Sequence, residues 1–302
     1  MKKPIKSIRT NTLLHDKDTN VVYLSPWLRI CFPCFYQRLL VKLEIANIKV
    51  RELKNTNDYW ARDYMPIQLG ENEFLKYKYN PDYLNQKEED RKYITNCTNV
   101  LRGMGIKCRS TKLIIDGGNM VPCGQYIMMT DKVFTENERE KGDADFHALL
   151  ELELGHPVII IPWDESHGNY NDESSDVYGH ADGFIKWCGG NRILMSNHGD
   201  DMPKEAAAIR KALEDKGFTV TEMRFKGKVA KPSPEFNWAY INFLQVGNKI
   251  IMPTFCIEED AIAQQYIQDA FPECTIYMIE SGEIAAKGGA LHCLSWNIFS
   301  PQ

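Results

Sequence analysis

The sequence predicts an α/β fold in which five similar units close into a ring. Segments with the order strand, strand, helix, strand follow one another along the chain. Short polar signatures introduce the first three units at intervals of about 50 to 65 residues, the length of one supersecondary repeat. Repeats of this kind pack on their neighbours and can close on themselves. Each signature then lies at the same point of its unit, so we expect the signatures to meet on the central axis.

Hydrophobic runs and turn residues place the elements of the first four units. Strands are expected over residues 66–69, 74–79, 112–115, 120–121, 125–130, 158–161, 184–187, 192–196, 218–223, 240–246, 249–252 and 275–279. Helices are expected over residues 91–102, 138–154, 204–216 and 258–270. Gly217 is a natural end for the third helix, because glycine adopts the left-handed C-terminal conformation without steric cost.

The two ends of the chain are predicted to share the fifth unit. Residues 291–296 begin it, and the N-terminus completes it with a strand over 21–24, a helix over 37–46 and a strand over 48–53. No linker or change in composition divides the chain. Residues 1–302 are therefore expected to form a single propeller domain, with the N-terminal segment completing the last blade.

Composition limits the classes of function. The net charge is −5 and no strongly basic run occurs, so nucleic acid is not an expected partner. No segment approaches the ~20 apolar residues that span a bilayer. The basic start, Met1 to Lys6, lacks the apolar stretch of an export signal. We therefore expect a cytoplasmic protein.

The nine cysteines show no framework spacing, so they are expected to be reduced thiols. Cys31 and Cys34 form an isolated Cys-x-x-Cys pair. A zinc or redox role is one interpretation, but no second pair supports it. Burial as apolar side chains is the favoured alternative.

The polar signatures combine a cysteine, a histidine and several carboxylates. Cys293 follows Gly288-Gly289, whose lack of side chains permits close backbone approach. His180 and Asp182 lie two apart and would share a face in an extended segment. His292 adjoins Cys293, but neighbours in a strand point to opposite faces, which makes it a poor partner. A thiolate nucleophile, an imidazole that moves protons and carboxylates that hold a cation could attack a cationic carbon.

The remaining acidic residues have simpler alternatives. Asp63 follows Arg62, with which it could form only a surface ion pair. Asp116-Gly117-Gly118-Asn119 could be only a turn. His180, Asp182 and Asp116 could also be the ligands of a metal-dependent hydrolase.

Taken in order, the signatures resemble one known family. They are Trp60-Ala61-Arg62-Asp63, Asp116-Gly117-Gly118-Asn119, His180-Ala181-Asp182-Gly183, Asn237-Trp238-Ala239-Tyr240-Ile241-Asn242-Phe243 with Pro253-Thr254-Phe255, and Gly288-Gly289-Ala290-Leu291-His292-Cys293. From about Tyr59 to the C-terminus, the chain resembles the agmatine deiminase and bacterial-type peptidylarginine deiminase family of the guanidine-modifying superfamily. The resemblance implies a five-bladed α/β propeller (pentein) of ββαβ repeats around a central active site.

The resemblance also implies roles for individual residues. By position, Cys293 is the nucleophile and His180 the general acid and base. Asp63 and Asp182 grip the guanidinium nitrogens, and Asp116 orients the histidine. Trp60 and Asn242 line the substrate pocket, although a core tryptophan is the ordinary alternative for Trp60.

The reaction implied is hydrolysis of a guanidinium group to a ureido group and ammonia through an S-amidino-cysteine, without metal or organic cofactor. Agmatine, which gives N-carbamoylputrescine, is the leading small cationic substrate, followed by peptidyl-arginine. An amidinotransferase with the same residues and a non-enzymatic propeller remain alternatives. The N-terminus departs from the family, since Val21-Val22-Tyr23-Leu24-Ser25-Pro26-Trp27 replaces its usual Glu-Trp and Pro-His signature. The sequence leaves the oligomeric state open, with a homodimer as the candidate.

Overall fold

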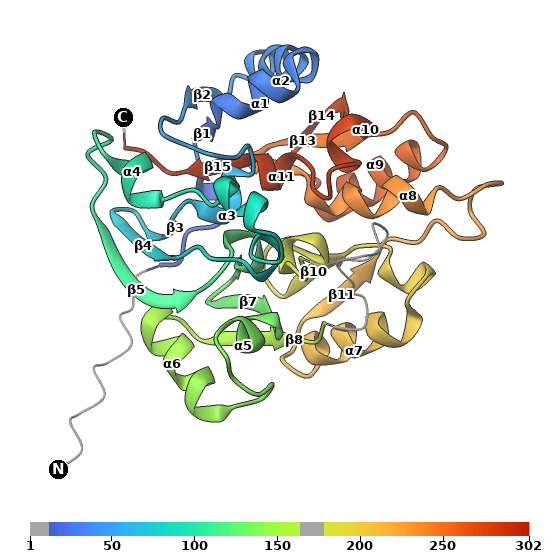
Figure 1. Ribbon diagram of the computed structural model, residues 1–302. Coiled ribbons are helices and arrows are strands. Elements are labelled where there is room, and N and C mark those ends of the chain that lie inside the picture. The colour runs from blue at the N-terminus through green and yellow to red at the C-terminus, as the bar shows by residue number, and fades with distance from the viewer. Residues whose placement is uncertain (1–11, 164–177, 302) are drawn as a thin grey trace.

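The computed structural model describes residues 12–163 and 178–301. Within them, three-stranded sheets form the five blades of the predicted α/β propeller (Figure 1). The first four sheets are β3 (Ile67–Gly70), β4 (Glu73–Lys78) and β5 (Cys108–Ile114); β6 (Val121–Cys123), β7 (Tyr126–Thr130) and β8 (Val158–Ile161); β9 (Ile185–Trp187), β10 (Arg192–Met195) and β11 (Thr219–Glu222); β12 (Leu244–Val246), β13 (Lys249–Thr254) and β14 (Thr275–Glu280).

Each middle strand runs antiparallel to the first strand of its blade and parallel to the third. A parallel pair needs a long crossover, which is usually helical. The crossovers of these four blades contain α4 (Cys97–Leu101), α6 (Ala144–Leu154), α7 (Pro203–Glu214) and α9 (Glu259–Ala270). In Figure 1 these helices lie toward the outside of the molecule, which leaves the first strands nearer the axis.

The fifth sheet joins the two ends of the chain. β15 (Ser295–Ile298) pairs antiparallel with β1 (Val21–Leu24), and β1 pairs parallel with β2 (Lys49–Glu52). α1 (Pro26–Cys31) and α2 (Pro33–Ile45) supply the crossover between β1 and β2. This is the pairing that the sequence predicts, and it places α11 (Leu291–Leu294), which carries Cys293, directly before β15.

The middle strands are buried on both faces because each is packed between neighbouring blades. In β10, Ile193 and Met195 pack in one cluster with Ile159 of the second blade. Leu194, which points to the opposite face, packs in another cluster with Met252 of the fourth blade. The core therefore consists of apolar layers between blades rather than one central mass.

Four predicted elements differ from the structure. The strand predicted over 240–246 is shorter, because Trp238–Asn242 form a 3-10 helix and β12 begins at Leu244. The helix predicted over 91–102 is interrupted, because Asn96 accepts a hydrogen bond from the Thr98 backbone N–H and starts a new, short helix, α4. The helix predicted from residue 138 begins at Ala144, where Asp143 caps it in the same way. The segment predicted to enter the fifth blade as a strand forms the short helix α11 before β15.

Cys31 and Cys34 are both exposed, so the expectation that they are buried is wrong. The buried face of α2 is formed by Phe35, Leu39 and Leu43, whose spacing of four residues defines one side of a helix. Cys34 lies off that side.

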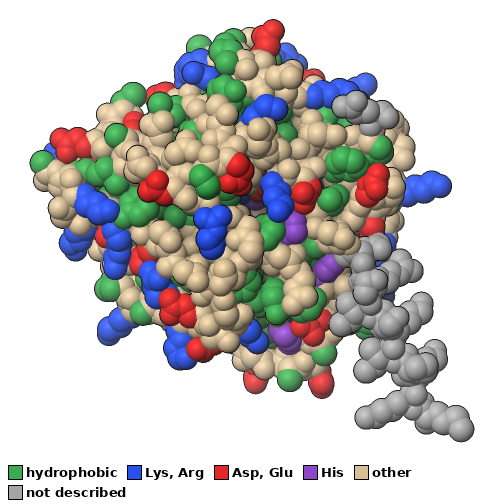
Figure 2. All heavy atoms as spheres, turned by 180° about the vertical axis from the view of Figure 1, so that it is seen from behind, with side chains coloured by type: hydrophobic (Ala, Val, Ile, Leu, Met, Phe, Trp, Pro, Cys, Tyr) green, Lys and Arg blue, Asp and Glu red, His purple; other side chains and the backbone are tan. Residues whose placement is uncertain are grey.

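The outer surface carries mixed charges. Figure 2 shows acidic and basic side chains interspersed over the face turned away from the view of Figure 1. None of the helices in the described part of the chain has both the length and the hydropathy needed to cross a bilayer.

The layered core predicts a large effect for one leucine. Leu194 is fully buried, so Leu194→Ala should lower the free energy of unfolding by about 2–5 kcal/mol. Leu152 on α6 is 57% exposed, and Leu152→Ala should change it by less than about 0.5 kcal/mol. Urea unfolding of both variants measures this difference. Equal losses would contradict the assignment of the middle strands as the core.

Candidate active site

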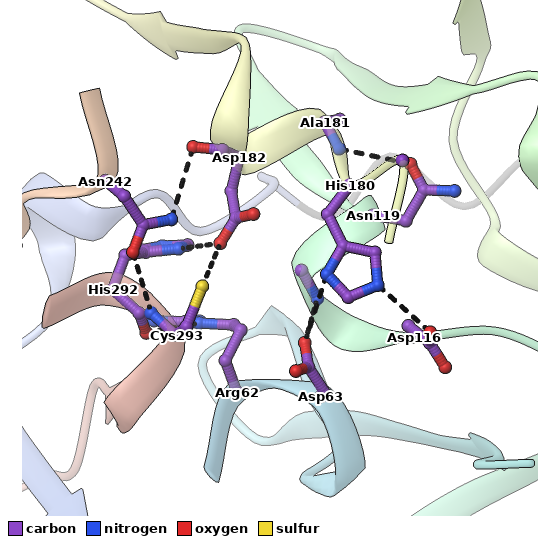
Figure 3. A network of polar contacts seen from close by, with 12 residues as sticks. Arg62, Asp63, Asp116, Asn119, His180, Ala181, Asp182, Asn242, His292 and Cys293 are labelled. Atoms are coloured by element: carbon purple, nitrogen blue, oxygen red, sulfur yellow. Dashed lines mark hydrogen bonds and ion pairs between the residues drawn. The ribbon is translucent and has the colours of Figure 1, made fainter. Parts of the chain in front are cut away.

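Cys293 lies in α11, at the point where the chain turns into the fifth blade. Its side chain is 8% exposed. The Asn242 side chain holds the surrounding backbone: its Oδ1 accepts hydrogen bonds from the backbone N–H of Ala290 at 3.1 Å and of Cys293 at 3.2 Å. Its Nδ2 donates to the backbone oxygen of Asp182 at 3.4 Å. Asn242 thus ties the cysteine segment to the third signature (Figure 3).

His180 is buried between two carboxylates. Its Nε2 lies 3.0 Å from Asp116 Oδ2 and its Nδ1 lies 3.6 Å from Asp63 Oδ1 (Figure 3). Burial acts to lower the pKa of His180, but Asp63, Asp116 and Asp182 outweigh it and raise the pKa to about 10. Both ring nitrogens can donate only in the imidazolium form. His180 is therefore protonated at neutral pH.

Asp182 faces the cysteine from the other side of the site. Its Oδ2 lies 2.5 Å from His292 Nδ1 and accepts a hydrogen bond from Cys293 Sγ at 3.7 Å. Burial opposes ionisation of Asp182, but the hydrogen bond and charge of His292 outweigh it, so the pKa is lowered. Asp182 is a carboxylate in the resting site.

In Asp63 and Cys293, by contrast with Asp182, the pKa is raised. Burial, offset in part by His180, raises the pKa of Asp63 to about 7. Burial, together with the charges of Asp182 and Asp63, raises the pKa of Cys293 well above its ordinary value. The cysteine is therefore a neutral thiol in the resting site, since two carboxylates disfavour a third negative charge.

Two glycines allow close packing in this site. A side-chain carbon on Gly118 would lie 2.6 Å from His180 Nδ1, 2.9 Å from Asp63 Oδ1 and 3.1 Å from Asp182 Oδ1. One on Gly289 would lie 2.7 Å from the Trp60 ring. His180 and the two Asp Oδ1 atoms thus come together at Gly118, which is possible because residue 118 has no side chain.

The second signature also joins neighbouring blades. Asn119 Oδ1 accepts hydrogen bonds from the backbone N–H of Thr130 at 2.8 Å and of Ala181 at 3.3 Å. The Gly118 backbone N–H donates to Asp63 Oδ1 at 3.0 Å. These bonds fix the first three signatures relative to one another.

The metal alternative requires His180, Asp182 and Asp116 to share one point. Instead, His180 contacts Asp116 and Asp63, and Asp182 contacts His292 and Cys293. Among residues 12–163 and 178–301, no group of three or more His, Cys, Asp or Glu side chains is placed to hold a metal ion.

The structure brings together all five residues predicted to be catalytic: Cys293, His180, Asp182, Asp63 and Asp116. Trp60 lies beside them against Gly289, and Asn242 contacts backbone groups rather than the space between the carboxylates.

Sequence reasoning missed His292. It placed His292 and Cys293 on opposite faces of a strand, but residues Leu291–Leu294 are helical. In this conformation both side chains reach Asp182. The glycine pair before the cysteine, which can interrupt a strand, is the signal that could have indicated this.

Comparison with known proteins identifies the family and the fold. Residues 30–298 match the sequence pattern of Porphyromonas-type peptidyl-arginine deiminase. An agmatine deiminase of Pseudomonas fluorescens strain Pf-5 is 24% identical over 88% of this chain and 81% of its own length. One of Ectopseudomonas mendocina is also 24% identical, with the same coverage. The solved structure of C. jejuni agmatine deiminase superposes with a TM-score of 0.75 at 18% identity, covering 96% of both chains.

The close approach of His180 and Asp63 to Gly118 predicts how a substitution there changes the pKa of His180. Gly118→Ala should push His180 away from Asp63, so the pKa of His180 should fall from its raised value by about one unit or more, because a nearby opposite charge is lost. NMR titration of histidine ring signals measures this shift. Gly183→Ala is the matched control, since a carbon added there meets no atom within 4 Å. An unchanged His180 titration in Gly118→Ala would contradict the geometry.

Proposed function

Since the chain belongs to the Porphyromonas-type peptidyl-arginine deiminase family, we propose that it hydrolyses a guanidinium group to a ureido group and ammonia, with agmatine as the leading substrate. It is a hydrolase that acts on C–N bonds, as its relatives are. One observation carries the proposal of mechanism: the Cys293 thiol lies against Asp182, and the His180 imidazolium lies against Asp63 and Asp116, three buried carboxylates.

Asp63 and Asp182 are proposed to bind the guanidinium nitrogens. Their Oδ1 atoms both lie close to Gly118, so a planar cation bound between the two carboxylates would donate to both. Hydrogen bonds between ionised partners are the strong ones. The guanidinium of Arg62 is directed elsewhere, to Asn297 Oδ1 and the backbone oxygen of His292.

The substrate is proposed to activate the nucleophile. In the resting site the carboxylates raise the pKa of Cys293. A bound cation offsets their charge and lowers the pKa of a nearby thiol. The thiol proton then passes to solvent, and the thiolate is formed only when a cationic substrate is present.

In the first half-reaction, Cys293 Sγ bonds to the guanidinium carbon. His180 gives its proton to one nitrogen of the tetrahedral intermediate. The C–N bond breaks, ammonia leaves, and an amidino group remains on sulfur as a thiouronium cation. Because its pKa is raised, His180 is protonated at neutral pH and can supply this proton.

In the second half-reaction, neutral His180 takes a proton from water as the water oxygen bonds to the amidino carbon. The C–S bond then breaks, which returns the thiolate and releases the ureido product. The hydroxyl proton is lost to solvent, where ammonia takes it up. Each step uses groups of this chain and water, so the proposal invokes no metal or organic cofactor.

Supporting roles follow from the contacts. Asp116 orients His180 through Nε2. Asn242 holds the backbone of the nucleophile. Trp60, half-buried against Gly289, is proposed to line the path to Cys293.

Peptidyl-arginine is the second candidate substrate, because the matching family carries that name. Colorimetric detection of ureido product across agmatine, free arginine, arginine peptides and methylated guanidines tests both candidates. Turnover of agmatine above the others supports the proposal, and preference for arginine peptides favours the second candidate. Amine-dependent transfer of the amidino group would instead reveal an amidinotransferase.

The nucleophile is tested by substitution. Cys293→Ser should abolish turnover and leave the fold intact, because a serine hydroxyl is far less ionised near neutral pH. Cys274→Ser is the matched control, since Cys274 is also buried but lies in a different cluster. A haloacetamidine should add one group at Cys293, and substrate should protect, as mass spectrometry of the digest would show. Near-normal kcat in Cys293→Ser would reject the mechanism.

The titration of Asp63 and His180 predicts how kcat/KM depends on pH. Below about pH 7 Asp63 is protonated and cannot pair with a cation, so kcat/KM should rise with pH through this region. Above about pH 10 His180 loses the proton that ammonia requires, so kcat/KM should fall. Asp63→Asn should lower the maximum by at least ~10²-fold, through lost charge and alignment, and should remove the limb near pH 7. An acid limb that persists unchanged in Asp63→Asn would contradict this assignment.

A further inference from the structure

A row of buried groups with alternating charge leads from Asp182 away from the nucleophile. His292 Nδ1 lies 2.5 Å from Asp182 Oδ2, and its Nε2 lies 3.4 Å from Asp16 Oδ2. Asp16 Oδ2 accepts a bond from Lys186 Nζ at 3.0 Å. The side chains of Asp182, His292 and Lys186 are at most 5% exposed, and that of Asp16 is 22% exposed.

The ring of His292 lies between two carboxylates. Each of its ring nitrogens faces a carboxylate oxygen, Nδ1 that of Asp182 and Nε2 that of Asp16. Contacts at both nitrogens fix the orientation of the ring.

We propose that His292 is a positioning residue, held by Asp16, that keeps Asp182 as an oriented carboxylate for the guanidinium. The N-terminal turn that carries Asp16 is then part of the active-site machinery. The consequences of this inference for catalysis rest on the proposed function. The contacts within the row are independent of that function.

Asp16 is fixed in place independently of His292. Asn297 Nδ2 on β15 donates to Asp16 Oδ1 at 3.0 Å, and Lys186 approaches from β9. The backbone oxygen of Asp16 accepts from Thr19 Oγ1 at 2.7 Å. Two blades thus position a residue that lies far from Cys293 in the chain.

His292 lies between two compartments. With Asp16, Lys186 and Asn297 it lines a cavity of about 100 Å³ near the N-terminal turn, whose lining includes neither Cys293 nor His180. Its Nδ1 reaches the other compartment, where Asp182 contacts Cys293. His292 therefore provides a direct link between Asp16 and Asp182.

The pKa values of Asp182 and Asp16 support the positioning role of His292. The carboxyl groups of Asp182 and Asp16 both have lowered pKa values despite burial, and His292 contributes to each. Removing one member of such a row leaves a buried charge without its partner. The charged or titratable groups that face Asp182 are His292, Cys293, His180, Lys186 and Asp63, and those that face Asp16 are Lys186, His292 and Arg62.

The experiment compares three single variants of the full chain. In His292→Asn, Asp182 loses the partner that lowers its pKa and holds its Oδ2. KM should rise by at least ~10-fold with a smaller change in kcat, because an interaction with the bound cation is weakened. Asp16→Asn should raise KM in the same direction, though it leaves every residue that contacts Cys293 in place.

Asp18→Asn is the matched control. Asp18 belongs to the same turn, Asp16–Asp18, and undergoes the same change, but its carboxylate contacts His15 rather than His292. Its KM and kcat should equal those of the unmodified protein. Folded His292→Asn and Asp16→Asn proteins with unchanged KM would overturn the proposal. If His292→Asn fails to fold, Asp16→Asn decides alone.

A measurement without substrate separates this inference from the proposed function. In ¹⁵N-histidine NMR, the ring signals of His292, assigned by their loss in His292→Asn, should move in Asp16→Asn, because the neighbour of Nε2 changes, and should not move in Asp18→Asn. A protein that turns over no guanidine but shows this response would refute only the proposed function. An active deiminase whose His292 signals are the same in Asp16→Asn would refute only the positioning role.

Discussion

The burial of three carboxylates around one imidazole and one thiol is the constraint on which the rest of this structure depends. Asp63, Asp116 and Asp182 are each at most 5% exposed, and buried charges are costly unless partners compensate them. His180 compensates two of them directly and is held protonated as a result. The arrangement still carries excess negative charge, which favours the binding of a cation.

The propeller meets this constraint by assigning the groups to different blades. Asp63 precedes the first sheet, Asp116 the second, His180 and Asp182 the third, and Cys293 the fifth. The segments that carry these groups are held at fixed distances by neutral amide side chains. Asn119 and Asn242 serve as these amide clamps. Those clamps use backbone hydrogen bonds, so they add rigidity without adding charge.

The sequence predicted the blade order and the convergence of the catalytic set because both follow from a repeated pattern. Alternation in the strands and the spacing of signatures survive errors in single elements, such as the interrupted helix over 91–102. The predictions that failed concern single short segments. A four-residue helix such as Leu291–Leu294 has no periodicity to detect, and Cys31 and Cys34 end up exposed because the neighbouring Phe35, Leu39 and Leu43 define the buried side. Asp16 could not be found, since its partners, Lys186 and His292, meet it only after the ring closes.

Ring closure also explains why the two ends of the chain are coupled to the chemistry. β15 pairs with β1, which brings the segment before β1 under the residues that precede β15. Asp182, which contacts the thiol, has a lowered pKa despite its burial, and His292 contributes most to the lowering. His292 contacts Oδ2 of Asp182, whereas Oδ1 lies near Gly118. In the proposed mechanism, a partner at Oδ2 keeps the carboxylate ionised and leaves Oδ1 for the guanidinium, while Asp16 holds the other ring nitrogen of that partner.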